Sequence, residues 1–131
     1  VWYARPALML RTRQGVIIGA RGFSQELASL DLGNCPPPAQ MLREMQPLTC
    51  TRTRNLPTAY GRVEQIRFER PLLLESGWQG VPGPVRVVRE TVLSGLQKGN
   101  VYGFDAEGRM VFSRQWITPG FGFILVPSSR R

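Results

Sequence analysis

The stretch that decides the fold runs from Gly99 to Val126 and reads GNVYGFDAEGRMVFSRQWITPGFGFILV. Two runs of alternating apolar and polar residues flank the tetrad Asp105-Ala106-Glu107-Gly108. The tetrad has the residues of a type I turn closed by a glycine in the left-handed conformation, which is a common connection in β-hairpins. The pattern therefore predicts antiparallel strands over residues 101–104, 109–118 and 121–126.

Working outward, the same kind of pattern recurs along the chain. Residues 7–13 alternate and residues 16–20 are apolar, with Gln14-Gly15 between them, which predicts two strands joined by a tight turn. Strands are also expected over 62–69 and 85–93, and Pro71 limits the segment after it to an edge or short strand. Residues 49–54 alternate threonine with arginine and predict an edge strand.

Local helix is expected in two places. Residues 24–32, SQELASLDL, have Ser24 in an N-cap position and leucines at helical spacing, which predicts a short helix ended by Gly33-Asn34. Residues 39–46, after three consecutive prolines, have room for one helical turn. The chain is therefore predicted to be an all-β antiparallel meander with one short helix, forming a curved open sheet or an incomplete barrel.

Composition agrees with a single small β domain over residues 1–131. The chain is 42% hydrophobic, enough for one modest core. Its 14 glycines and 11 prolines are scattered, which suits short strands and tight turns rather than a helical bundle. No apolar stretch reaches the roughly 20 residues of a membrane-spanning helix. Because the sequence begins at Val1, we expect any targeting segment to lie outside it.

The formal net charge is +8, and all but one of the 17 basic residues are arginines, the exception being Lys98. A GC-rich genome is the preferred explanation for this skew, because the arginines are spread along the whole chain. The guanidinium group nevertheless matches carboxylates and phosphates well. The positive charge therefore predicts an acidic partner, whether anionic polysaccharide, phospholipid head groups or nucleic acid.

The residue types argue against an enzyme. The chain has no histidine, which excludes a histidine-based triad and the commonest metal ligand. Two cysteines alone cannot close a zinc site, so neither metal nor cofactor is expected. Three carboxylate pairs are candidates for glycoside hydrolysis, namely Glu64 with Glu69, Glu75 with Glu90, and Asp105 with Glu107. The last pair lies in the turn and the others alternate with arginines, which is typical of cross-strand ion pairs, so no catalytic residue is predicted.

Cys35 and Cys50 flank the proline-rich segment. The favoured interpretation is a disulfide, which would stabilise the fold by roughly 3 kcal/mol for a loop of about 15 residues in the chain-entropy model. The alternative is a pair of buried free thiols. A disulfide would indicate an oxidising compartment.

Arg114, Trp116 and Trp78 are the candidate contacts for a glycan or a protein partner. Arg114 and Trp116 share one face of their strand, and if that face points outward they would form a patch of guanidinium and indole suited to sugars and anions. The preferred alternative is that Trp116 anchors the core and Arg114 pairs with a carboxylate. Trp78 belongs to the segment 76–84. The preferred interpretation of this segment is a plain surface loop, and the alternative is a mobile lip over a cavity.

Three segments resemble one known family. Residues 8–23, LMLRTRQGVIIGARGF, are similar to the opening strand pair of the YjbF/GfcB family, the lipoproteins of exopolysaccharide and group 4 capsule operons. Residues 24–31, SQELASLD, resemble the polar, leucine-bearing segment that follows. Residues 100–120, NVYGFDAEGRMVFSRQWITPG, resemble the closing hairpin of the family, and Ser-Arg-Gln-Trp followed by Pro-Gly is the most specific part.

The resemblance implies a non-enzymatic β protein that assists polysaccharide secretion from the periplasmic side of the outer membrane. Expected partners are polysaccharide-export proteins or acidic polysaccharide, with the outer membrane reached through a lipid anchor outside the given sequence. Two other functions stay open on the residues alone. One is a basic β module that binds nucleic acid, which would have reduced thiols, and the other is a lipid or acyl-chain carrier with a concave apolar sheet.

Overall fold

The computed structural model describes residues 8–127, which form ten strands and one 3-10 helix. The elements in chain order are β1 (Met9–Arg13), β2 (Val16–Arg21), β3 (Ser29–Asp31), η1 (Pro38–Arg43), β4 (Leu48–Leu56), β5 (Ala59–Phe68), β6 (Leu72–Leu74), β7 (Val85–Val92), β8 (Val101–Phe104), β9 (Met110–Thr118) and β10 (Phe121–Leu125). The predicted all-β class with one short helix is confirmed.

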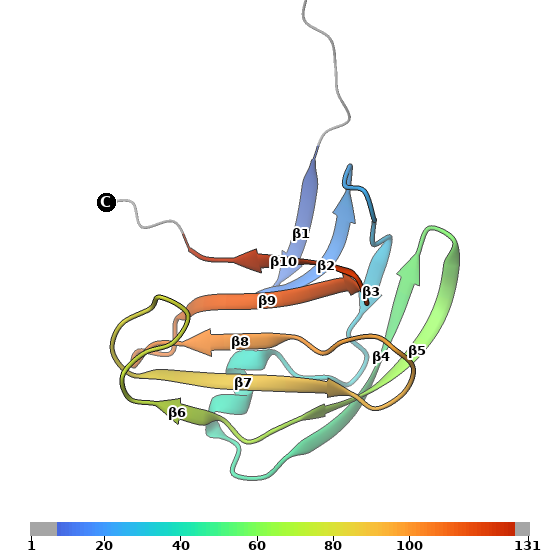
Figure 1. The fold of residues 1–131 in the computed structure, drawn as a ribbon. Coiled ribbons are helices and arrows are strands. Elements are labelled where there is room, and N and C mark those ends of the chain that lie inside the picture. The colour runs from blue at the N-terminus through green and yellow to red at the C-terminus, as the bar shows by residue number, and fades with distance from the viewer. Residues whose placement is uncertain (1–7, 128–131) are drawn as a thin grey trace, which may run out of the picture.

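Seven strands form one curled antiparallel sheet in the order β10-β9-β8-β7-β5-β4-β3, and β6 pairs with β7 beside it. Strands β1 and β2 form a separate hairpin. Figure 1 shows the sheet bending so that β7–β10 cross in front of β3–β5, with the hairpin standing at the open side of the curl. The structure is thus an incomplete barrel, as the sequence predicts.

Side chains, rather than a hydrogen-bonded ladder, attach the hairpin to the far end of the sheet. The side-chain oxygen of Gln115 on β9 accepts the Ile17 N–H at 2.7 Å, and its Nε2 donates to the Gly15 carbonyl at 2.7 Å. The rings of Phe23 and Phe123 add an edge-to-face contact with centroids 4.7 Å apart. These contacts cover the open side of the curled sheet.

An apolar cluster fills the space between the curled sheet, the hairpin and η1. Strand alternation directs every second side chain inward. Met41 of η1 is fully buried in this cluster, so the 3-10 turn contributes a side chain to the core. The principal buried side chains are Val16, Ile17, Leu27, Leu30, Met41, Ile66, Phe68, Val88, Tyr102, Phe104 and Ile117.

The closing hairpin confirms the predicted turn. One oxygen of the Asp105 carboxylate accepts the N–H groups of Glu107 and Arg109, both at 2.9 Å. Gly108 has φ +82°, the left-handed conformation that glycine adopts without strain. Strands β8, β9 and β10 begin and end within a residue of the predicted bounds.

Two local predictions are wrong. Residues 24–32 do not form a helix, because Leu27 exchanges backbone hydrogen bonds with Ala20 and the residues 29–31 pair with β4 as β3. Tertiary strand pairing overrides a weak helical propensity here. Residues 49–54 are not at an edge, since β4 lies between β3 and β5. The turn expected within residues 39–46 is confirmed as η1.

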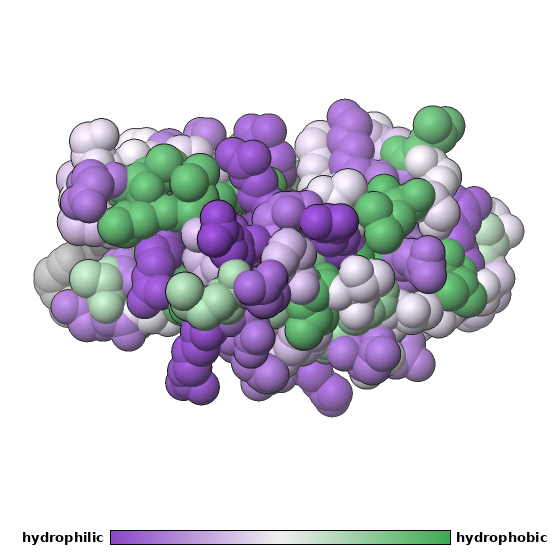
Figure 2. All heavy atoms as spheres, turned by 90° about the horizontal axis from the view of Figure 1, so that it is seen from below, coloured by the Kyte–Doolittle hydropathy of each residue, from purple (hydrophilic) through white to green (hydrophobic). Residues whose placement is uncertain are grey.

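On the face viewed from below, apolar side chains gather in patches of different size. Figure 2 shows separate apolar patches on that face with charged and polar side chains between them. Within residues 8–127, no helix is long and apolar enough to cross a membrane.

Candidate functional site

Four charged side chains are buried inside the curl, and we call them the ion cluster. They are Arg52 and Arg54 of β4, Glu64 of β5 and Glu90 of β7, each at most 6% exposed. Strand alternation brings them there, since Arg52 and Arg54 take inward positions and Arg52 lies directly opposite Glu64 in the register. Both signs are present in equal number, so the cluster is formally neutral.

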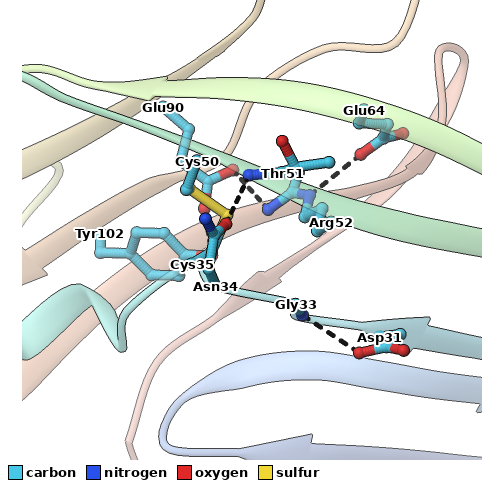
Figure 3. The surroundings of a disulfide bond; sticks show 10 residues. All are labelled: Asp31, Gly33, Asn34, Cys35, Cys50, Thr51, Arg52, Glu64, Glu90 and Tyr102. Carbon is cyan, nitrogen blue, oxygen red and sulfur yellow. Dashed lines mark hydrogen bonds and ion pairs between the residues drawn. A yellow bond between two sulfur atoms is a disulfide. The ribbon is translucent and has the colours of Figure 1, made fainter.

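Arg52 bridges the two carboxylates, as Figure 3 shows. Its Nε lies 2.9 Å from Glu64 and its Nη1 lies 3.0 Å from Glu90. Arg54 binds the second oxygen of Glu64 at 2.7 Å and donates from Nη1 to the carbonyls of Trp116 and Ile117, both at 3.2 Å. The cluster therefore connects β4 and β5 to β9 on the other side of the curl.

Tyr102 and Asn100 extend the cluster with neutral hydrogen bonds. The Tyr102 hydroxyl donates to Glu90 at 3.1 Å and accepts from Asn100 Nδ2 at 2.9 Å. Asn100 Oδ1 in turn accepts the Trp116 N–H at 2.9 Å. A continuous polar chain thus runs through the interior from β4 to β9.

The environment shifts the pKa values of this cluster. Burial alone would raise the pKa of Glu64, but hydrogen bonds and charges from Arg54 and Arg52 outweigh it and hold this pKa below its ordinary value. Burial would lower the pKa of Arg52, yet the charges of Glu90, Tyr102 and Glu64 raise it. Burial, followed by the charge of Glu90, raises the pKa of the Tyr102 hydroxyl well above its usual range.

Cys35 and Cys50 form a disulfide beside the ion cluster, with their Cα atoms 5.1 Å apart. Asn34 fixes the adjoining loop by accepting the Thr51 N–H at 2.8 Å, and Asp31 accepts the Gly33 N–H at 3.0 Å (Figure 3). The favoured interpretation of the two cysteines agrees with this bond. The bond closes the loop that carries η1 over the core.

The carboxylates are brought together in other pairs than the sequence suggested. Glu64 and Glu90 share Arg52, whereas half-buried Glu69 pairs with Arg67 at 3.2 Å. Asp105 and Glu107 of the turn both pair with exposed Arg109. Within residues 8–127, no group of three acidic, cysteine or histidine side chains could hold a metal ion. Each of the two buried carboxylates is therefore engaged by arginine rather than by a second carboxylate.

The three predicted contact residues all lie away from the interior. Arg114 is exposed, and no carboxylate of the described residues lies within ion-pair distance of it. Trp116 is half-buried on the same face of β9, with Lys98 Nζ 4.4 Å from its ring centre. Trp78 packs edge-to-face on Phe112 with ring centres 4.8 Å apart. Their role in contacting a glycan or partner stays a prediction.

A surface groove lies between the β1–β2 hairpin and the β4–β5 turn, and we call it the hairpin groove. Its volume is about 320 Å³, within the usual range of ligand sites. Figure 1 shows the two hairpins projecting on the same side, with the segment that joins β2 to β3 between them. Its lining side chains include Met9, Arg11, Arg21, Glu26, Pro57 and Tyr60.

A second hollow of about 370 Å³ shares Glu26 and Pro57 with the hairpin groove. It is lined mainly by hydroxyl and amide side chains, among which Thr118 donates to the Gln25 side-chain oxygen at 2.6 Å. The two hollows are therefore neighbours on the surface.

Sequence reasoning missed both arrangements. The Thr-Arg-Thr-Arg alternation of residues 51–54 was a usable signal for the ion cluster, since strand periodicity requires both arginines to share a face. The hairpin groove had no local signal, because its walls come from β1, β2 and the β4–β5 turn, far apart along the chain.

Comparison with known proteins gives one match. A family model described as group 4 capsule polysaccharide lipoprotein GfcB, YjbF matches residues 1–127. No curated protein and no solved structure matches the chain.

Proposed function

Since the chain belongs to the YjbF family of group 4 capsule polysaccharide lipoproteins, we propose that it is a non-enzymatic accessory protein of exopolysaccharide or capsule polysaccharide secretion. The observation that carries the proposal is the length of the match, which spans residues 1–127 of a chain of 131. The protein acts by contact with export proteins or with acidic polysaccharide.

The proposed location is the periplasmic side of the outer membrane, where a lipid anchor would hold the protein. The lipoprotein description of the family supports an envelope location. The Cys35–Cys50 disulfide supports an oxidising compartment, which the periplasm provides.

The absence of catalysis is proposed from the state of the two buried carboxylates. A glycosidase needs one carboxyl group that holds a proton and another that is ionised beside the substrate. Here the pKa of Glu64 is held low by Arg54 and Arg52, and Glu64 is only 2% exposed. Both carboxylates are engaged by arginine, which suits a structural role.

The two alternative functions receive less support. A lipid carrier needs an apolar cavity, but the concave side of this sheet is occupied by the ion cluster and the apolar core. A nucleic-acid-binding module of the cytosol would keep reduced thiols, which disagrees with the disulfide.

Gene deletion with complementation tests the proposal. Deletion in the native host is expected to reduce polysaccharide on the cell surface, measured by uronic acid assay of washed cells, while total intracellular precursor is retained. A plasmid copy of the wild-type gene is expected to restore the surface polysaccharide. An unchanged amount of surface polysaccharide in the deletion strain would contradict the proposed function.

A further inference from the structure

We propose that the hairpin groove binds an acidic saccharide chain, with Arg11 and Arg21 contacting its carboxylates and Tyr60 packing against a sugar ring. The inference rests on the proposed function, because it names the ligand that the accessory protein would hold. Three independent features of the groove carry it: the state of its two arginines, its exposed aromatic ring, and the polar hollow that continues it.

The two arginines point to the same side of the hairpin. In the register Met9 lies opposite Arg21 and Arg11 lies opposite Gly19, so Arg11 and Arg21 share one face. Neither has a carboxylate of residues 8–127 within ion-pair distance. Their charges are therefore available to an anionic ligand, for which the guanidinium fork is well suited.

Arg11 is held in place before any ligand arrives. A side chain at Gly19 would come within 2.8 Å of the Arg11 guanidinium, so the glycine leaves the space in which that group lies. The same group donates from Nη2 to the Ala28 carbonyl at 3.4 Å. Holding a long side chain in advance reduces the entropy lost on binding.

Tyr60 supplies the aromatic surface of the groove. It lies in the β4–β5 hairpin and is 71% exposed, which is unusual for a ring of this size. The face of an exposed tyrosine packs against apolar C–H surface, and its hydroxyl forms hydrogen bonds. A sugar ring presents both kinds of group.

The polar residues of the groove suit the hydroxyl groups of a saccharide. One oxygen of the Glu26 carboxylate accepts the Gly22 N–H at 2.7 Å, and the carboxylate lines both hollows. The second hollow continues with Ser24, Gln25, Thr58 and Thr118. A ligand lying along both hollows would be a chain of several sugars rather than a single sugar. The groove has two arginines, Arg11 and Arg21, and one carboxylate, Glu26, so its net charge is positive.

Binding of the purified protein to a hexamer of galacturonic acid tests the inference, with neutral maltohexaose as the reference ligand. Isothermal titration calorimetry at low salt is expected to show binding of the acidic hexamer only. Arg21→Ala and Tyr60→Ala are each expected to weaken binding about tenfold, the loss of one charge-assisted or aromatic contact. The affinity of Arg21→Lys for the acidic hexamer should lie between those of the wild type and Arg21→Ala, because lysine keeps the charge and lacks the guanidinium fork.

Two other arginine variants locate the site. Arg70→Ala removes the same charge from the exposed loop between β5 and β6 and is expected to leave the affinity within about twofold of the wild type. Arg114→Ala examines the outer face of β9. A tenfold loss in Arg114→Ala with unchanged binding in Arg21→Ala and Tyr60→Ala would overturn the groove as the site. Circular dichroism of each variant verifies that the exposed substitutions leave the fold intact.

The remaining outcomes separate the ligand from the function. Binding to vesicles of anionic phospholipid through Arg21 and Tyr60, without binding of the acidic hexamer, would overturn the saccharide and favour a lipid head group. A wild-type protein that restores surface polysaccharide in cells yet binds no acidic saccharide would overturn this inference and leave the proposed function standing. A deletion without effect on surface polysaccharide would instead remove the proposed function.

Discussion

Arg52 makes two ion pairs at once where solvent does not reach. Its guanidinium holds Glu64 on one side and Glu90 on the other, and all three side chains are nearly fully buried. Bringing such charges out of water is costly, and the attraction between them compensates only when every partner is in place. The free energy lost on replacing any one of these residues is therefore mainly the cost of leaving its partners buried without an opposite charge.

Replacement of Glu64 by glutamine is expected to destabilise the protein by about 3–5 kcal/mol, because Arg52 and Arg54 would lose their shared carboxylate inside the fold. Urea unfolding at neutral pH measures this loss. The matched control is Glu69→Gln, which removes a carboxylate from a pair with Arg67 whose side chains are 42% and 48% exposed. The control is expected to change stability by less than about 1 kcal/mol, and equal losses in the two variants would contradict the argument.

Stability is also expected to fall at both ends of the pH range. Because the folded-state pKa of Glu64 is lowered, its contribution is present above the unfolded value of about 4.3 and is lost as the pH falls through the folded pKa. Because the pKa of Tyr102 is raised, stability is lost as the pH rises above about 10. Thermal unfolding across pH measures both limits. Glu64→Gln should reduce the loss of stability at acid pH, and Tyr102→Phe should reduce the loss of stability at alkaline pH.

At the scale of elements, one side chain of β9 makes two hydrogen bonds to the backbone of the β1–β2 hairpin. Gln115 binds a donor and an acceptor of the hairpin backbone, at Ile17 and Gly15. The hairpin forms one wall of the groove.

Gln115→Met keeps the volume of the side chain and removes its two hydrogen bonds to the hairpin, together with the one to Ser113, leaving the Ile17 N–H buried without its partner. Amide hydrogen exchange at Ile17 is expected to become faster, with a loss of about 1–3 kcal/mol in local protection. Gln65→Met, on the exposed face of β5, serves as the control and should leave the Ile17 amide unchanged. Unchanged exchange at Ile17 in Gln115→Met would show that the hairpin is held by other contacts.

The disulfide secures the second attached element, the loop with η1. Cys35→Ala combined with Cys50→Ala is expected to cost about 3 kcal/mol, since the bond spans 15 residues. Thermal unfolding with and without reductant provides the measurement. Reductant should lower the unfolding temperature of the wild type and leave that of the double variant unaltered, and a reductant effect on the double variant would point to a cause other than this bond.

The element scale also shows what the sequence could and could not predict. The strands of the closing hairpin were readable because turn residues and alternation agree over residues 101–126. The predicted helix over residues 24–32 is wrong because the helical spacing of Leu27 and Leu30 is only a local signal. The backbone groups of these residues form hydrogen bonds with β2 and β4 instead. Arg52 and Arg54 in a strand suggested an exposed edge, since charge is usually a surface property, and their buried partners lie on other strands.

At the scale of the whole molecule, the fold keeps its charges in two separate roles. The ion cluster neutralises itself in the interior, so it contributes nothing to the net charge of +8. Composition alone predicted an acidic partner but not its site. The hairpin groove forms only when the hairpin meets the β4–β5 turn, and that meeting is a property of the folded chain.

The mutual dependence of Arg52, Arg54, Glu64 and Glu90 has a consequence for how this interior can diverge. Any one-step change strands an opposite charge, whereas a joint exchange of the quartet for apolar residues of like volume removes the desolvation penalties of all four charges together. The four positions therefore form an epistatic block. A combinatorial library selected for folding should yield all-ionic and all-aliphatic quartets and be depleted of the mixtures between them.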